Sequence, residues 1–298
     1  MESFSRGWNF LKQAWQMAFK DKDLLKPTLF ALVVGAIVSA IGIVPIVGVA
    51  LLMGDSNVGG IVLFALGALL IFAQFIVSYI FSAMTVYLIY QYLTEGDGKL
   101  PDAWAIVRRD FFDLLTLAAV STVVNLIKNA ANRNRKNGVG AAVARAGAGL
   151  LETLWTEAAL LVLPAMVVDD LNLKKGLERV WSITKSNLLL IGISTVGVKW
   201  VTGLIGFFLA ILGAAIGFAI GGGLAYATGD TTVTFIGIAI GVMIFFFFIM
   251  VSSVISSYTS TAYHTCLYIW AREVEAAREH GKSVERVVAP APLAAVLK

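Results

Sequence analysis

The chain has a single cysteine, two histidines and few charged residues, and each shortage excludes a class of protein. Cys266 alone cannot form an internal disulfide framework. His264 and His280 do not stand in a spacing that pairs metal ligands, so they predict no metal centre. Charged residues make up 14% of the 298 residues, against roughly 25% in soluble domains, which excludes an ordinary soluble protein.

Sequence motifs for catalysis and nucleotide binding are also missing. No Gly-x-Ser-x-Gly nucleophile motif occurs. Residues 281–283 read Gly-Lys-Ser like the end of a phosphate-binding loop, but Ala276 stands where that loop requires its first glycine. Asp169 and Asp170 could hold a divalent ion, although acidic residues that cap the start of a surface helix are the simpler interpretation. We therefore expect no enzyme, no cofactor, no bound metal and no nucleic-acid partner.

Long apolar runs are what the sequence does contain. Hydrophobic residues make up 58% of the chain, and the mean hydropathy is +0.83. Several runs exceed the ~20 residues that a helix needs to cross a bilayer, and the strict alternation of a membrane barrel is missing. The sequence therefore predicts an all-α, polytopic membrane protein, with about six membrane helices in a 2+2+2 arrangement within one membrane domain, residues 1–298.

Two long hydrophobic pairs, residues 28–93 and 188–269, follow the same plan. A basic, tryptophan-bearing surface helix precedes each pair, within residues 1–27 and 171–187. Each pair has a short turn without Lys or Arg and ends in a tyrosine-rich segment, and residues 261–268 align without gaps on 85–92. We expect a parallel pseudo-repeat; the alternative is convergence, because aromatic residues are common at any membrane interface.

The central pair, residues 112–168, breaks the charge pattern of the other two. Elsewhere Lys and Arg gather outside the spans and are absent from the turns, which places both termini, including the tail 270–298, in the cytoplasm. The basic turn 128–149 holds five Lys and Arg residues, and the run 112–127 is short for a span. Either these helices enter part-way or project into the cytoplasm, or they cross and violate the rule. We favour the first arrangement.

Ionisable and polar residues within the apolar segments are the candidate site residues, because such residues are costly in a membrane and tend to mark pathways. Glu152 and Glu157 lie in the second central helix. Lys199 could pair with Glu157, or could extend to the headgroups if its span begins near residue 196. Asn125 could mark the closed end of a half-inserted hairpin, and Gln74 is expected to hydrogen-bond between helices.

Glycine spacing gives a second specific signal, in the second long pair. Glycines four residues apart let helix backbones approach closely, which predicts packing within the chain, or else self-association of protomers through the same face. The glycines concerned are Gly213, Gly217 and Gly221 in one helix and Gly237 and Gly241 in the other.

The order of several segments resembles a known family. Arg108 and Arg109 precede an apolar helix; a Trp155-containing helix then ends in Leu-Pro-Ala-Met-Val-Val-Asp at 163–169, before a basic segment at 176–185. This order resembles a family of prokaryotic six-helix membrane proteins and, more distantly, the membrane domain attached to some glycerophosphodiester phosphodiesterases. The resemblance implies a six-helix fold in a prokaryotic cell membrane, with no assigned activity, and it carries over no functional residue.

Two functions remain as main alternatives, with a membrane enzyme third. An oligomeric channel or permease for small solutes or ions would use the central pair and its carboxylates. A membrane-organising or lipid-binding scaffold would use the basic surface helices, whose lysines can reach anionic lipid headgroups. We favour transport, with membrane lipids and further copies of the chain as the expected partners.

Overall fold

The computed structural model describes residues 2–54, 56–133, 139–228, 231–283 and 287–297. Over these ranges the chain forms ten helices and no strand. Six helices are long and apolar enough to cross a membrane. The prediction of an all-α polytopic membrane protein is therefore confirmed.

The helices group into two compact units. Unit 1 comprises Met1–Lys20, Leu188–Tyr263 and Val288–Lys298, and unit 2 comprises Asp21–Asn187 and His264–Val287. Two helices, α7 (Leu173–Thr228) and α8 (Thr231–Glu279), belong to both units because each continues from one into the other.

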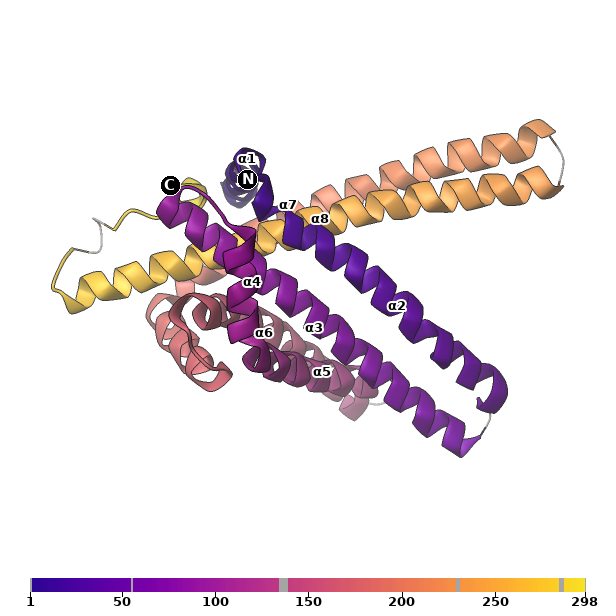
Figure 1. The fold of residues 1–298 in the computed structure, drawn as a ribbon, viewed down its shortest axis with the longest axis horizontal. Helices are drawn as coiled ribbons and strands as arrows, with labels where there is room; N and C mark the ends of the chain where they lie inside the picture. The colour runs from indigo at the N-terminus through magenta and orange to yellow at the C-terminus, as the bar shows by residue number, and fades with distance from the viewer. Residues whose placement is uncertain (1, 55, 134–138, 229–230, 284–286, 298) are drawn as a thin grey trace. The chain divides into compact units, whose positions relative to one another are not determined.

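Unit 2 begins with the 3-10 helix η1 (Lys22–Leu24) and the antiparallel pair of α2 (Lys26–Met53) and α3 (Asn57–Glu95) (Figure 1). These bounds agree with the first pair predicted from the sequence. Ser56 caps α3 by accepting a hydrogen bond from the N–H of Gly59 at 2.9 Å. At its other end α3 stops at Gly96, whose φ of 83° is the left-handed conformation that favours glycine.

The central pair is more helical than the sequence predicts. The sequence predicts a turn at 128–149, but α5 (Phe111–Arg133) and α6 (Val139–Asp169) run through most of it. Residues 134–138 lie outside the described residues. The apolar part of α5, Phe111–Asn132, is about 33 Å long at 1.5 Å per residue, so α5 is long enough to cross a bilayer.

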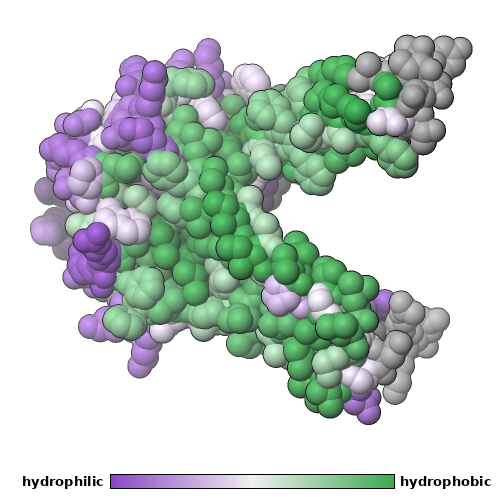
Figure 2. All heavy atoms as spheres, turned by 45° about the vertical axis from the view of Figure 1, so that its right-hand side comes forward, coloured by the Kyte–Doolittle hydropathy of each residue, from purple (hydrophilic) through white to green (hydrophobic). Residues whose placement is uncertain are grey.

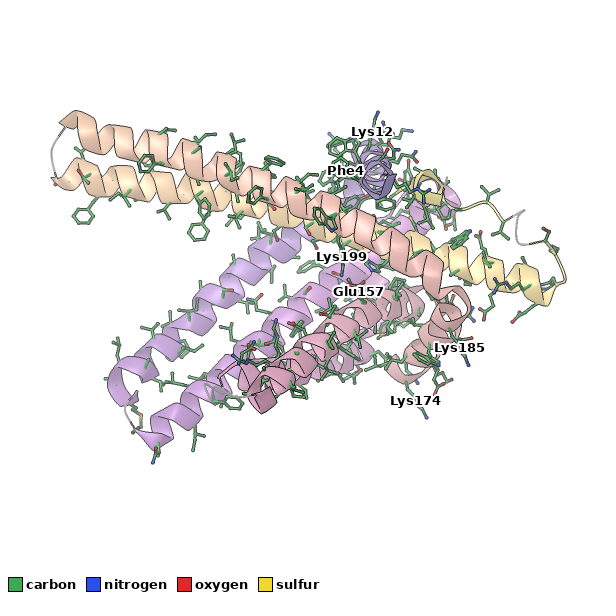
Figure 3. All side chains as sticks on the ribbon, turned by 180° about the vertical axis from the view of Figure 1, so that it is seen from behind. Phe4, Lys12, Glu157, Lys174, Lys185 and Lys199 are labelled. Carbon is green, nitrogen blue, oxygen red and sulfur yellow. The ribbon has the colours of Figure 1, made fainter. Side chains whose placement is uncertain are left out.

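Short helices lead into the longer ones of unit 2. α4 (Leu100–Arg109) follows α3 and is amphipathic, with Ala103 and Val107 buried and Trp104 and Arg108 exposed. The first turns of α7 carry the basic residues of the predicted surface helix 171–187, and Lys174 and Lys185 project from it in Figure 3.

Unit 1 contains a hairpin formed by α7 and α8, together with the terminal helices α1 (Glu2–Lys20) and α9 (Ala291–Leu297). Figure 2 shows hydrophobic residues covering both this hairpin and the α2–α3 pair, as expected for helices that face lipid. α9 packs against α1 and buries Leu293 and Val296.

The N-terminal helix α1 packs against α8 in unit 1, although it precedes the α2–α3 pair in the chain. The ring of Phe10 lies edge-on to that of Tyr263, with ring centroids 5.4 Å apart. The hydroxyl of Tyr258 donates a hydrogen bond to the carbonyl of Ala14 at 3.2 Å. The N-terminal surface helix is thus held by the end of the second long pair.

Candidate functional site

A cavity of about 190 Å³ lies between α3, α5 and α6 in unit 2. It is well above the roughly 10–15 Å³ that one water molecule requires. Most of its wall is apolar, but the three helices also contribute hydroxyl, amide, indole and carboxylate groups. The polar residues that line it are Ser78 and Tyr79 of α3, Ser121 and Asn125 of α5, and Glu152, Trp155 and Thr156 of α6.

The hydroxyl oxygen of Ser121 on α5 forms hydrogen bonds with residues of both α3 and α6. The side chain is buried, and its hydroxyl donates to the carbonyl of Leu117 at 2.9 Å. A hydroxyl has one proton and two lone pairs, so Ser121 Oγ accepts its other two hydrogen bonds. Trp155 Nε1 donates to Ser121 Oγ at 2.8 Å, and Tyr79 donates its hydroxyl proton at 2.7 Å. These hydrogen bonds fix the orientation of the polar groups on the cavity wall.

Glu152 brings a charge to the cavity, and Lys128 of α5 neutralises it. The Lys128 ammonium lies 2.5 Å from Glu152 Oε2 and 2.7 Å from Oε1. Both side chains are about one-third exposed or less, and a partly buried charge in a membrane protein needs such a partner. Asn125 lines the same cavity, and its Oδ1 atom accepts a hydrogen bond from Asn129 Nδ2 at 2.8 Å. Glu152 and Asn125 thus share one site.

Glu157 lies apart from that cavity, against α8. Its Oε2 atom is 3.5 Å from Nε2 of His264, which is 2% exposed. Lys199, the partner considered from the sequence, is an exposed residue of unit 1, whereas Glu157 belongs to unit 2. Figure 3 labels both residues, on α6 and α7 respectively. An ion pair between Glu157 and Lys199 therefore stays a prediction.

Gln74 forms hydrogen bonds between α2 and α3. Its Nε2 atom donates to the carbonyl of Gly35 at 2.9 Å and to Ser39 Oγ at 2.7 Å. This geometry is the interhelical contact expected from the sequence, and Gln74 does not line the polar cavity.

The spaced glycines lie at the contact between α7 and α8. A Cβ atom at Gly217 would lie 2.4 Å from the carbonyl oxygen of Gly241, and one at Gly221 would lie 2.5 Å from that of Gly237. At Gly213 the nearest atom is the Cβ of Phe248, at 2.7 Å. The glycine faces are thus occupied within the chain.

Unit 2 also contains a cluster of opposite charges that the sequence does not predict. Asp169 accepts hydrogen bonds from the hydroxyl of Tyr268 and, at 2.7 Å, from Arg272, and Arg179 pairs with Glu275. These partners come from α6, α7 and α8, about 100 residues apart along the chain. No spacing in the sequence could have revealed them.

Asp169 and Asp170 therefore do not have the capping role assigned to them. Asn172 caps α7 instead, by accepting a hydrogen bond from the N–H of Lys175 at 3.0 Å. Asp170 lies 3.1 Å from Arg109, which also pairs with Asp110 at 2.6 Å. Burial raises the pKa of Asp110, and its hydrogen bond with Arg109 opposes that rise.

Within the described residues, no group of three or more His, Cys, Asp or Glu side chains is placed to hold a metal ion. The cavity's carboxylate, amide and hydroxyls are groups that bind a small polar solute or an ion. No known protein family matches the chain, and no curated protein matches it. The family resemblance noted in the sequence stays a prediction.

Proposed function

We propose that this protein is a permease-like transporter of a small polar solute or ion, which binds in the cavity between α3, α5 and α6. The observation that carries the proposal is a preformed cavity with a group of polar side chains, including the carboxylate of Glu152, among helices apolar enough to cross a membrane. Ligand sites in transporters lie among such helices, where polar groups are otherwise costly.

The fixed orientation of the polar groups supports binding. Tyr79 uses its proton on Ser121, so its oxygen lone pairs stay available to a donor in the cavity. The Glu152 carboxylate can accept further hydrogen bonds beside Lys128, because each oxygen offers more than one acceptor position. A solute that donates hydrogen bonds fits this wall best, because the Lys128 ammonium beside both carboxylate oxygens opposes the approach of a cation.

Transport through this cavity requires the central pair to cross the membrane, which is the alternative to the part-way arrangement favoured from the sequence; both helices are long and apolar enough to do so. We place the protein in a prokaryotic cell membrane with both termini in the cytoplasm, which puts the loop between α5 and α6 outside. A cysteine at Asn137, a position outside the described residues, tests this with a membrane-impermeant thiol reagent, because the native Cys266 is fully buried. Labelling from outside supports the crossing, whereas labelling from the cytoplasm alone contradicts it.

We also propose that several copies assemble. The glycine face of α7 is not the interface, because α8 covers Gly217 and Gly221. Assembly must use other lipid-facing surfaces, such as those that expose Phe207 and Phe218.

The decisive experiment is flux into liposomes that contain the purified full-length chain. Potassium entry is followed with an enclosed indicator dye and glycerol entry by liposome swelling. Glu152→Gln removes the negative charge from the cavity, and we expect the flux of the transported probe to fall at least tenfold. Glu178→Gln makes the same chemical change at an exposed residue outside the cavity and leaves flux unchanged.

A second variant shows whether flux falls because the cavity is blocked or because the protein no longer folds. Ser78 is an exposed lining residue, so Ser78→Phe narrows the cavity without disturbing the Lys128–Glu152 pair. We expect it to reduce flux while the protein elutes from a sizing column like the wild type. Absence of flux of either probe in the wild type, or flux that neither variant reduces, would falsify the proposal.

A membrane-organising scaffold is the second candidate, and α1 favours it. One side of α1 packs against α8, while Phe4 and Trp8 on the other side are about half exposed. Phe4 and Lys12 project from α1 in Figure 3, as in helices that lie at the membrane surface. Binding to liposomes with anionic lipid, together with no flux of either probe, would support this function over transport.

A further inference from the structure

A second cavity in unit 2 is apolar and lies where α4 meets the α2–α3 pair. It has a volume of about 650 Å³, within the range of roughly 300–1,000 Å³ typical of ligand sites. Phe30 of α2 and Phe81 of α3 contribute neighbouring rings, with centroids 6.4 Å apart. Val33 and Met84 extend this surface, and Trp104 of α4 forms one side. We call this cavity the α4 groove.

The lining of the α4 groove matches a hydrocarbon chain. Every lining residue is apolar, and the indole of Trp104 is the most polar group present. Phe30 and Trp104 are 45% and 41% exposed, so the groove is open along its length. Because α2 and α3 are apolar enough to span a membrane, this opening faces lipid chains.

Positive charges stand at the rim of the α4 groove. Arg108 lies one turn after Trp104 on the same face of α4, and its guanidinium is 5.6 Å from the centre of the Trp104 ring. Lys99 immediately precedes α4 and is exposed. Neither side chain has an ion-pair partner in the part of the chain that the structure describes. Arg108 is thus free to bind a phosphate with two parallel N–H groups.

We infer that the α4 groove binds one anionic phospholipid, with an acyl chain along Phe30 and Phe81 and the headgroup phosphate at Arg108. An apolar groove alone would accept any lipid chain, and surface charge alone would attract anionic lipids without a fixed position. The combination, with tryptophan at the boundary between the two, selects one class of lipid at one place. This site is separate from the polar cavity of the proposed transport function.

Hydrogen bonds within the protein fix the position of α4, and so the shape of the α4 groove, without a bound lipid. Gln91 of α3 is buried and binds both ends of the first turn of α4. Its Oε1 atom accepts from the N–H of Lys99 at 2.8 Å, and its Nε2 atom donates to Asp102 Oδ2 at 3.0 Å. The Oδ2 atom of Asp21 accepts a further hydrogen bond, from the N–H of Gly98 at 2.8 Å. These bonds fix α4, and with it Trp104 and Arg108, against the α2–α3 pair.

The test is retention of lipid by the purified full-length protein, measured by native mass spectrometry. The probes are phosphatidylglycerol and phosphatidylcholine with identical acyl chains, added in equal amounts. We expect the wild type to retain one phosphatidylglycerol molecule in preference to phosphatidylcholine. Arg108→Gln should lower that preference about fivefold to tenfold, since one cation at the membrane surface contributes about 1 kcal/mol or more. Arg145→Gln removes a charge elsewhere and should leave the preference unchanged.

The groove itself is tested with Val33→Phe, which fills it from an exposed position and so does not overpack the protein interior. We expect retention of both lipids to fall. Val58→Phe enlarges an equally exposed residue of α3 outside the groove and should have no effect. Equal retention of the two lipids by the wild type, or equal effects of Arg108→Gln and Arg145→Gln, would overturn the inference. So would a change of oligomeric state in Val33→Phe with lipid retention intact, which would assign the groove to a second copy of the chain.

Discussion

The α2–α3 pair of unit 2 and the α7–α8 hairpin of unit 1 follow the same sequence plan but are held together by different atoms. In α2–α3 a polar side chain bridges the helices, because Gln74 donates to Gly35 and Ser39. In α7–α8 the backbones themselves meet, because glycines face one another and leave no room for a Cβ atom. Similar hydropathy patterns therefore do not imply similar packing.

Two glycines within the helices, away from the turns, show the same difference. A Cβ atom at Gly42 of α2 would meet the side chain of Leu70, at 2.5 Å, which can move aside. A Cβ atom at Gly217 would meet the backbone of α8, which cannot. We infer that α2–α3 tolerates adjustment between its helices, whereas α7–α8 is a rigid pair. The polar cavity and the α4 groove both lie in the unit with the adjustable pair.

The largest effect is expected for Gly217→Leu, which breaks the backbone contact of α7–α8. The new side chain would have to displace Gly241, and such overpacking costs about 3 kcal/mol. Thermal unfolding in detergent, followed by helical circular dichroism, should show a clear fall in the melting temperature. The matched control is Gly223→Leu, because nothing lies within 4 Å of a Cβ atom there. If the control is equally destabilised, the glycine contact is not what holds the pair.

A smaller effect is expected for Gln74→Leu, which removes the polar bridge of α2–α3. Hydrogen bonds between membrane helices contribute about 0.6 kcal/mol each on average, so loss of two should cost about 1 kcal/mol. Thr94→Val is a suitable control, because Thr94 donates only to carbonyls of its own helix, those of Tyr90 and Gln91. A Gln74→Leu protein as unstable as Gly217→Leu would contradict the proposed difference between the hairpins.

The sequence predicts the helices of both hairpins well because long apolar runs and glycine spacing act locally. It also singles out two of the residues that line the polar cavity, although it does not predict the cavity. Glu152 and Asn125 are conspicuous in an apolar segment, since such groups are costly there. Ser121, Tyr79 and Trp155 are ordinary in membrane helices, and only the packing of three helices brings them together. Their role could not be predicted from the residues alone.

The basic segment 128–149 shows how charge can mislead a prediction. The apolar runs stop at its borders, so the sequence predicts a turn. In the structure Lys128 stays helical, and its charge is neutralised by Glu152, 24 residues along the chain. Charge marks the end of an apolar run, but it does not end a helix when a partner from another helix is present. Residues that pair across helices are the ones that linear patterns miss.

The smallest effect is expected for Ser39→Ala, which removes one of the two acceptors of Gln74. The Gln74 amide keeps its hydrogen bond to the Gly35 carbonyl, and the lost Ser39 contact should cost about 0.5 kcal/mol.

A double-mutant cycle, measured as unfolding in detergent, shows whether Ser39 acts through Gln74. In the Gln74→Leu background Ser39→Ala should cost almost nothing, because its partner is already gone. In the Gly217→Leu background it should cost the same as in the wild type, because the two hairpins are held by unrelated contacts. Additive losses with Gln74→Leu would show that Ser39 stabilises α2–α3 by some other contact.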